Sequence, residues 1–482
     1  MKLLTLIFLA VAVLASPYPG VRTSIGISSL NQLLQAKLPI VISDIISKGI
    51  PDTTFNEKFL MIPMTLKLKN LTIEVFSIDV KNSELEVNNQ TGQLYLTLRN
   101  FNLFLTGIYT YYIPLPIAGF FNVSMTDATV ILPVSLSTTV EGEILANIAP
   151  LEGNLTSLII DIEAKNTFSS VWILLSHLWP LSTYMNKIVV DTIDSISKRL
   201  NPPLAKFFDS IRYTDVLGSL PIAGDYHFYS MNLNPLSIDS NLNGTFFLIN
   251  ALGEESNVVP PSIIPNMIGV APIRVQFTEY YFDSLMWAMY SSGSLSFYIK
   301  SENMPKNIPY TFTTTGLSKV VPNLAKVYGA NLPVDLQCAV YKVPNIDIQV
   351  TVSASLDVNC NFIVRVGPNA KITAFTIITQ IITQFSASIN NQNGGIYMIA
   401  SLDNTNTEFS EFSLLNSNIG VFSLTKLAGA FNYYMYALVL KANTMLETTG
   451  IRLPLPEGIQ VQKAAFNIYQ GAAEIDFQPV FG

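Results

Sequence analysis

The sequence predicts an α+β fold of two tubular domains, each a long twisted antiparallel sheet wrapped around a long helix. Short runs in which apolar and polar residues alternate recur in both halves, as in antiparallel strands with one buried face. Each half also contains helical stretches with one apolar stripe. We therefore expect domains at 17–245 and 271–482, joined by a proline-containing linker at 246–270.

The composition is unusually apolar for a chain of 482 residues. Hydrophobic residues make up 49% and charged residues 13%, and the mean hydropathy is +0.38. Ordinary globular chains are about 25% charged. Such a composition indicates either much buried surface or an interior that holds something apolar. The net charge of −7 argues against nucleic acid as the main partner.

Residues 1–16 have the features of a secretory signal peptide. Lys2 precedes an apolar run from Leu3 to Leu14, and small residues follow. A retained membrane anchor is the alternative, although the run is too short to span a bilayer. No later stretch offers about twenty unbroken apolar residues. We therefore expect a secreted chain with no transmembrane span.

The first half is expected to contain two helical regions with strands between them. The first is ISSLNQLLQAKLPIVISDIISKG, in which Pro39 should kink or break the helix and Gly49 should end it. The second runs from Ser170 to Ile211 and should break near Pro180 and at Pro202-Pro203. Alternating runs such as GQLYLTLRNFNLFLTG predict the strands.

The second half repeats this order of elements. The strand-like segment IRVQFTEYYFDSL leads into WAMYSSGSLSFYIK, and a helix is expected at LSKVVPNLAKVYG. Long alternating strands follow, including IDIQVTVSASLDV and KITAFTIITQIITQFSASI. A last helix, FSLTKLAGAFNYYMYALVLKANTMLETTG, precedes the closing strand GIQVQKAAFNIYQ.

The apolar stripes of these helices are the candidate lining of acyl-chain pockets. Burial of each acyl methylene contributes roughly 0.8 kcal/mol, so one chain can supply on the order of 10 kcal/mol before ordering costs. The alternative is that the same side chains pack on the sheets as ordinary core. The candidates in the first half are Leu30, Leu34, Leu38, Val41, Ile45, Leu174, Ile188, Val189, Thr192 and Ile196, and those in the second half are Leu317, Val321, Leu324, Val327, Leu427 and Tyr434.

An uncharged aromatic stretch, GIYTYYIPLPIAGFF at 107–121, is a candidate for contact with a lipid surface. Pro114 and Pro116 cannot donate to a strand ladder, so we expect two strand ends joined by an apolar turn. Tyrosine suits a membrane interface because its ring is apolar and its hydroxyl is polar. Packing on its own domain is the alternative. The candidate contacts are Tyr109, Tyr111, Tyr112, Ile113, Leu115, Ile117, Phe120 and Phe121.

Two further features fit an extracellular chain. The two cysteines, Cys338 and Cys360, lie in strand-like segments and are expected to form one bridge, with two buried free thiols as the alternative. Five Asn-x-Ser/Thr sequons predict a glycoprotein, although some are expected to be unused. The candidate acceptors are Asn70, Asn89, Asn122, Asn154 and Asn243.

Catalysis has little support in the sequence. His177 lies in the apolar WILLSHLWP, and His227 follows Asp225 in what looks like strand alternation. Neither has metal-ligand spacing around it, and we expect no cofactor and no metal. The Gly-x-Ser-x-Gly elbow and the phosphate loop are both missing from the sequence. We therefore expect no enzyme, with an esterase of unrecognised triad as the remaining alternative.

Several segments, in order and spacing, resemble one known family. They are Pro19-Gly20-Val21-Arg22, Tyr280-Tyr281-Phe282, Met304-Pro305, Val321-Pro322, Ala325-Lys326, Val352-Ser353-Ala354-Ser355, Asn416-Ser417-Asn418-Ile419-Gly420 and Leu453-Pro454-Leu455-Pro456. The chain resembles the bactericidal/permeability-increasing protein, lipopolysaccharide-binding protein and phospholipid transfer family. The resemblance implies a boomerang of two lipid-binding domains joined by a central sheet, each with a phospholipid in an apolar pocket.

The sequence departs from that family in two places. The family's disulfide lies in the first domain, whereas both cysteines here lie in the second half. The antibacterial members carry a lysine-rich hairpin where this chain has the uncharged stretch 107–121. We therefore expect a secreted protein that binds phospholipids or other acylated lipids, meets lipid surfaces peripherally and is suited to phospholipid transfer. The alternatives are a defence protein that binds lipopolysaccharide and a structural glycoprotein without a ligand.

Overall fold

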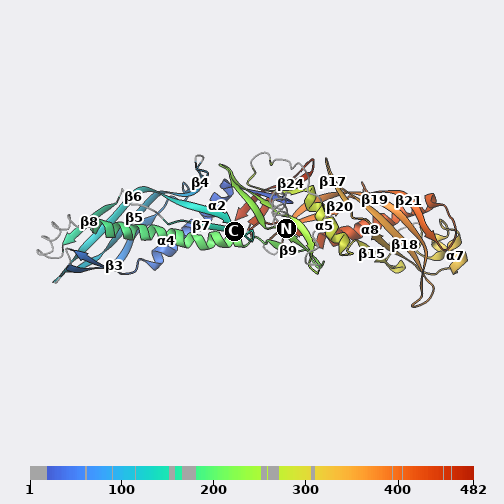
Figure 1. The fold of residues 1–482 in the computed structure, drawn as a ribbon, viewed down its shortest axis with the longest axis horizontal. Coiled ribbons are helices and arrows are strands. Elements are labelled where there is room, and N and C mark those ends of the chain that lie inside the picture. The colour runs from blue at the N-terminus through green and yellow to red at the C-terminus, as the bar shows by residue number, and fades with distance from the viewer. Residues whose placement is uncertain are drawn as a thin grey trace, which may run out of the picture.

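The computed structural model describes residues 19–481 apart from 60–61, 89–90, 114, 151–157, 165–180, 251–257, 259–266, 268–270, 305–309, 393–394, 404, 449 and 457–458. The expected signal peptide, most of the expected linker and the candidates Leu174, Asn89 and Asn154 therefore lie outside the described residues. The described chain is a strand-rich α+β protein, elongated in outline, with long sheets and long helices in both halves (Figure 1). No described helix is both long enough and apolar enough to cross a bilayer.

The helices are α2 (Ile27–Lys48), α4 (Leu181–Asp209), α5 (Glu279–Ser291), α6 (Thr314–Leu317), α7 (Asn323–Tyr328) and α8 (Leu424–Thr448), with a 3₁₀ turn η1 (Ser301–Asn303). The four sheets are built from strands of different lengths. Those of the first half's sheet are β2 (Thr53–Phe59), β3 (Ile62–Ser77), β4 (Glu84–Val87), β5 (Leu94–Ile113), β6 (Leu115–Thr138), β7 (Ile144–Ile148) and β8 (Ile159–Ala164).

A six-stranded sheet at the middle of the molecule takes strands from both halves. Its order is β11-β12-β1-β14-β24-β23, so β1 pairs with β12 on one side and β14 on the other. One face is apolar and belongs to the main core. On the other face, Arg274 Nε lies 2.6 Å from Asp476 Oδ1 and 3.2 Å from Glu474 Oε1. The strands are β1 (Val21–Gly26), β11 (Phe228–Leu233), β12 (Ser237–Leu242), β14 (Ile273–Thr278), β23 (Ile459–Tyr469) and β24 (Ala472–Phe481).

A small sheet, β13-β10-β9, lies beside the central one. Its strand β13 begins at Thr245, so the first residues of the expected linker belong to a strand. Its strands are β9 (Thr214–Val216), β10 (Ile222–Asp225) and β13 (Thr245–Leu248).

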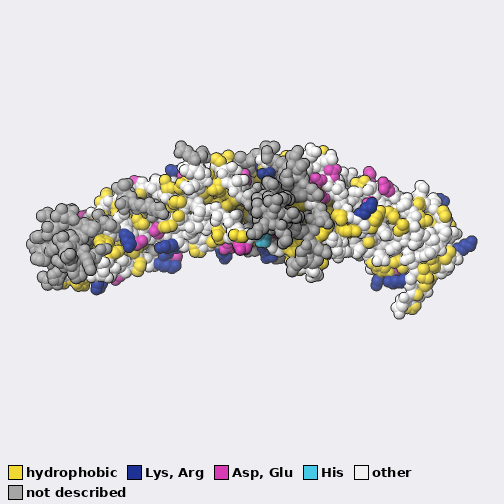
Figure 2. Space-filling model, in the orientation of Figure 1, with side chains coloured by type: hydrophobic (Ala, Val, Ile, Leu, Met, Phe, Trp, Pro, Cys, Tyr) yellow, Lys and Arg dark blue, Asp and Glu magenta, His cyan; other side chains and the backbone are white. Residues whose placement is uncertain are grey.

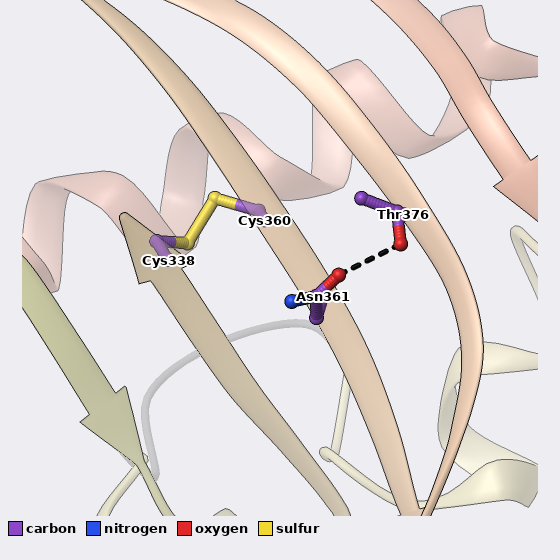
Figure 3. The surroundings of a disulfide bond; sticks show 4 residues. All are labelled: Cys338, Cys360, Asn361 and Thr376. Atoms are coloured by element: carbon purple, nitrogen blue, oxygen red, sulfur yellow. Dashed lines mark hydrogen bonds between the residues drawn. A yellow bond between two sulfur atoms is a disulfide. The ribbon is translucent and has the colours of Figure 1, made fainter. Parts of the chain in front are cut away.

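The second half has its own sheet, in the order β15-β16-β18-β19-β20-β22, with β17 on β18 and β21 on β19. Cys338 and Cys360 face each other across β16 and β18 and form the bridge expected from the sequence, buried in the core (Figure 3). Asn361 follows Cys360 in β18, and its Oδ1 accepts a hydrogen bond at 2.7 Å from Thr376 Oγ1 in β19. The strands are β15 (Ser296–Ile299), β16 (Val334–Val340), β17 (Asn345–Ile348), β18 (Val352–Arg365), β19 (Lys371–Gln392), β20 (Gly395–Leu402), β21 (Glu408–Ser417) and β22 (Ile451–Arg452).

Pro39, Pro202 and Pro203 do not break the described helices of the first half, and Pro180 lies outside the described residues. Helix α2 continues through Pro39, and α4 continues through Pro202 and Pro203. Pro39 and Pro202 lie on exposed sides of their helices. A carbonyl that loses its helical partner there can be solvated, so the cost is tolerable. Gly49 ends α2 as expected, with a positive φ of 62° that glycine adopts without strain.

The segment TEYYFDSL is helical, not strand-like. Strand β14 stops at Thr278 and helix α5 begins at Glu279. Buried side chains at Tyr281, Ser284, Leu285 and Ala288 follow a helical period. The aromatic residues had favoured a strand, but their spacing matches one face of a helix, and Glu279 in the first turn favours the helix dipole.

The helix expected at LSKVVPNLAKVYG is split in two. Helix α6 stops at Leu317 and α7 starts at Asn323. Leu317, Val321 and Leu324 are buried, but Val327 is 52% exposed and cannot line an interior.

Candidate functional site

The candidate lining residues of the first half share one interior. One face of α2 and one face of α4 pack with the inward side chains of the first half's sheet in a single apolar core. All the described candidates of this half are buried there: Leu30, Leu34, Leu38, Val41, Ile45, Ile188, Val189, Thr192 and Ile196. The hydroxyl of Thr192 donates to Ile188 O at 2.8 Å within the helix, so its methyl group is left to face apolar neighbours.

This interior is mainly aliphatic. The strands contribute leucine, valine and methionine side chains at alternate positions, opposite the leucine, isoleucine and valine side chains of the helices. The inward strand residues are Leu66, Leu68, Leu96, Leu98, Leu103, Leu105, Val123, Met125, Val130 and Leu132. Aliphatic side chains hop between rotamers and have the same chemistry as an acyl chain, so they suit an elongated hydrocarbon ligand.

Polar side chains hold the helices at the edges of this interior. The Asn31 amide on α2 exchanges two hydrogen bonds with the peptide of Leu85, at 2.6 Å and 3.2 Å. Asn201 on α4 does the same with Ile148, at 2.6 Å and 3.1 Å. Arg199 on α4 pairs with Asp44 on α2. These contacts satisfy polar groups at the rim and leave the space between helices and sheet apolar.

The described interior of the second half combines aliphatic side chains with five buried aromatic rings. Leu427 and Tyr434 of α8 are buried in the same cluster as the disulfide and the α6–α7 residues. The Tyr434 ring lies 4.3 Å from Phe312, and its hydroxyl donates to Tyr310 O at 3.1 Å. Burial raises the pKa of the Tyr434 hydroxyl. The Tyr434 ring is therefore held by both a ring contact and a hydrogen bond.

The stretch 107–121 forms the end of the β5–β6 hairpin. Tyr109 and Phe121 point inward and are buried, whereas Tyr112 and Phe120 are 42% and 46% exposed. Tyr109 faces Gly119 across the two strands, and Phe121 faces Gly107. A Cβ added at Gly107 would lie 2.7 Å from the Phe121 ring, so only glycine leaves room for it. The side chains of Tyr111, Ile113, Leu115 and Ile117 lie outside the described residues.

Pro116 is paired with Tyr112 but has no described strand on its other side. Strand β8 pairs with β6 only as far as Gly119. Among the described strands, β6 is therefore an edge at this point, where proline is tolerated. The hairpin end, defined here as residues 107–121, keeps its strand pairing to Ile113 and Leu115.

The uncharged hairpin end has a lysine beside it, which the sequence interpretation missed. Strand β3 runs alongside β5, and Lys67 Nζ lies 5.0 Å above the Tyr112 ring in a cation–π contact. Lys69 is exposed two residues further along the same strand. The alternation in MTLKLK predicts that both lysines share one face of that strand, but only the pairing of β3 with β5 places Lys67 at the aromatic end.

The pair of His227 and Asp225 serves the loop geometry. His227 lies between β10 and β11 instead of within a strand, and its Nδ1 is 2.5 Å from Asp225 Oδ1. The same carboxylate accepts from the His227 N–H at 3.0 Å and from Asn243 Nδ2 at 2.9 Å. These three contacts join the segment that holds Asp225 and His227 to the segment that holds Asn243. His177 lies outside the described residues, and no described cluster of three or more His, Cys, Asp or Glu residues could hold a metal ion.

The described sequons differ in exposure. Asn70 is exposed within β3, where the register with β5 shifts, and has a φ of 52°. Asn122 is partly exposed on the outward side of β6. Asn243 is also partly exposed, but its amide nitrogen is the one bonded to Asp225. Glycosylation at these positions stays a prediction.

Comparison with known proteins places this architecture in a family. The profile of the LBP / BPI / CETP family, C-terminal domain, matches residues 230–477, just over half of the chain. The chain belongs to the LBP / BPI / CETP family. It is 22% identical to the bactericidal permeability-increasing protein of Rattus norvegicus, over 95% of this chain and 93% of the rat protein.

A solved structure shows the same fold over the whole length. The crystal structure of lipopolysaccharide binding protein matches with a TM-score of 0.58 and 16% identity, covering 96% of this chain and 99% of that chain. The family match begins at residue 230, within β11, so this family member's C-terminal unit includes strands of the central sheet that precede the expected linker.

Proposed function

We propose that this family member is a secreted lipid-binding protein that holds phospholipid acyl chains in the interior of its first half and transfers phospholipid between lipid surfaces. The observation that carries the proposal is the aliphatic interior between α2, α4 and the first sheet. Membership of the LBP / BPI / CETP family supports lipid as the ligand.

We propose the first half as the main site because the helix faces that meet its sheet are aliphatic, although both interiors also contain aromatic rings. In the second half, the rings of Phe362 and Phe375 stack with their centroids 4.3 Å apart, in the cluster that also holds the disulfide. In the first half, the polar contacts made by Asn31 and Asn201 lie at the helix edges, and flexible aliphatic side chains lie between them. An acyl chain can replace contacts among such side chains, and no buried polar group would lose its hydrogen-bond partner.

The hairpin end is the proposed contact with the lipid surface. Tyr112 and Phe120 lie on its outward side, and Lys67 stands over the Tyr112 ring. An exposed aromatic pair with a neighbouring cation suits the headgroup level of a membrane, where rings enter the apolar boundary and ammonium groups meet phosphate. A lipid could pass from the membrane into the adjoining interior by this route.

Lipopolysaccharide is the second candidate ligand, because one structural relative is a lipopolysaccharide binding protein. Recognition of its phosphates relies on clustered Lys and Arg. The hairpin end offers Lys67 and Lys69 from a neighbouring strand but no basic residue of its own. We therefore propose phospholipid as the main ligand class.

The test is transfer of a fluorescent phospholipid between vesicles by the double variant Tyr112→Ser, Phe120→Ser. Loss of two half-exposed aromatic side chains should lower vesicle binding and transfer roughly tenfold. The melting temperature should be unchanged, because both side chains lie on the outward face. The matched control is Ile131→Ser with Leu145→Ser, two exposed apolar residues of the same sheet away from the hairpin end. Unchanged transfer by the aromatic variant would contradict the proposal.

A further inference from the structure

The far end of the second half is built from four segments that are distant in sequence. They are residues 298–304, 310–335, 362–376 and 415–427, which we call the distal end. Hydrogen bonds tie them together: Asn323 Nδ2 donates to Ile419 O at 3.1 Å, and Asn418 Nδ2 donates to Thr373 O at 2.8 Å. The turn between β18 and β19 and helix α7 both lie here, at the opposite end of the molecule from the hairpin end (Figure 1).

The described charges of the distal end are mostly basic, although the whole chain is acidic. It holds six basic residues and two acidic ones, Glu302 and Asp335. Because these are six of the chain's 27 basic and two of its 34 acidic residues, the rest of the chain has a net charge of −11. The basic residues are Lys300, Lys319, Lys326, Arg365, Lys371 and Lys426.

The two carboxylates of the distal end are already engaged. Arg365 pairs with Glu302, and its Nε lies 3.2 Å from Asp335 Oδ2. Tyr298 OH also donates to Asp335, and Lys371 Nζ donates to Tyr298 OH at 2.9 Å. Arg365 therefore offsets one of the two negative charges, and with five lysines the distal end keeps a net charge of +4 for an external partner.

All five lysines of the distal end are exposed and form no ion pair with another described residue. Lys319, Lys326 and Lys426 are the three that neither bond to Tyr298 nor lie within two residues of Glu302. Exposed apolar side chains accompany them. Val421 is 91% exposed, and Val327, Val366 and Ile372 are also exposed. In Figure 2 the right-hand end of the face in view carries dark blue and yellow side chains. A soluble polyanion would bind only the lysines. An anionic lipid surface would bind the lysines and also bury the exposed apolar side chains.

We infer that the distal end is a second docking surface, which binds anionic lipid membranes. The inference rests on the proposed function, because a lipid-carrying protein has to meet the surfaces that supply and receive its lipid. The lysines attract the phosphate layer, and Val421 and Val327 enter the boundary between headgroups and acyl chains. The buried cluster beneath the distal end and the hydrogen bonds between its segments hold the lysines on one end of the molecule.

The experiment compares vesicle flotation of the full-length protein and two variants. The first is Lys319→Gln, Lys326→Gln, Lys426→Gln, and its matched control is Lys198→Gln, Lys206→Gln, Lys463→Gln, which removes the same charge elsewhere. The probes are vesicles of phosphatidylcholine alone and of phosphatidylcholine with phosphatidylglycerol in equal parts. The first variant should lose at least about tenfold in affinity for the anionic vesicles, with little change on neutral ones. The control variant should keep wild-type binding.

Equal loss by both lysine variants, or no loss by the distal one, would overturn the inference. A third variant, Val421→Ser with Val327→Ser, separates a membrane from a soluble polyanion. Its anionic-vesicle binding should fall several-fold, and wild-type binding would overturn the assignment to a lipid surface. Lipid co-purified with each protein is measured in parallel. An empty wild-type protein would refute the proposed function, whereas the docking inference is decided by flotation alone.

Discussion

At the residue scale, asparagine side chains fix the helices onto the sheets. Asn31, Asn201 and Asn443 each exchange two hydrogen bonds with one backbone peptide of a neighbouring strand. An amide group has one donor side and one acceptor side, so it can replace a missing strand neighbour at a sheet edge. The sequence offers no sign of this role, because asparagine is common on exposed helix faces and the strand partner is distant in the chain.

Replacement of Asn443 tests this role. Its Oδ1 accepts from Leu402 N at 2.7 Å, and its Nδ2 donates to Leu402 O at 3.0 Å. Asn443→Ala would leave both backbone groups unpaired, so we expect a loss of roughly 1–3 kcal/mol in the free energy of unfolding, measured by chemical denaturation. The control is Asn432→Ala on the exposed side of the same helix, which should change stability by less than about 0.5 kcal/mol. Equal effects of the two substitutions would contradict the assigned role.

At the element scale, sequence periodicity predicted long helices better than short ones. The apolar face of α2 and its end at Gly49 could be predicted, because the helix is long and its apolar residues repeat regularly. Aromatic residues in α5 misled the prediction, since their preference for strands is weaker than the packing of Tyr281 among Phe246 and Phe277. Val327 was misplaced because α7 ends one residue later, at Tyr328, and the buried face that includes Leu324 does not extend to it.

Helix α5 is tied to β17 by a carboxylate whose ionisation opposes folding. Asp283 Oδ1 accepts from Ile346 N at 3.2 Å. Burial raises the pKa of Asp283 to about 6, with help from the Glu279 carboxylate and against the effect of the Ile346 hydrogen bond. The folded state therefore binds this proton more tightly than the unfolded state does. The contribution of the protonated Asp283 carboxyl to folding stability is largest below the ordinary pKa of 3.8. This contribution is lost as the pH rises through about 6.

Asp283→Asn should remove this dependence, because the amide oxygen still accepts the hydrogen bond and does not ionise. From about pH 4 to about pH 7, the stability of the wild type should fall relative to the variant by about 2 kcal/mol. Thermal unfolding across this pH range measures the difference. Asp161→Asn, an exposed carboxyl on β8, should keep the wild-type slope. A wild-type slope in Asp283→Asn would show that another group titrates.

At the scale of the whole molecule, the fold class, the two halves and the apolar interior follow from patterns along the chain. The family resemblance anticipated a central sheet, which here is built with β1 between strands of both halves. The distribution of charge could not be read from the sequence. The lysines of the distal end are scattered from residue 300 to residue 426, and only the fold collects them. The net charge of −7 conceals this basic surface.

The central claim is that the aliphatic interior of the first half holds phospholipid. The most direct test is mass spectrometry of the lipids extracted from the purified, secreted protein, expressed in moles of lipid per mole of chain. We predict at least one phospholipid per chain, and the spectrum would also distinguish phospholipid from lipopolysaccharide. A protein that carries no lipid and takes up none from liposomes would contradict the account. The apolar faces of α2 and α4 would then be ordinary core.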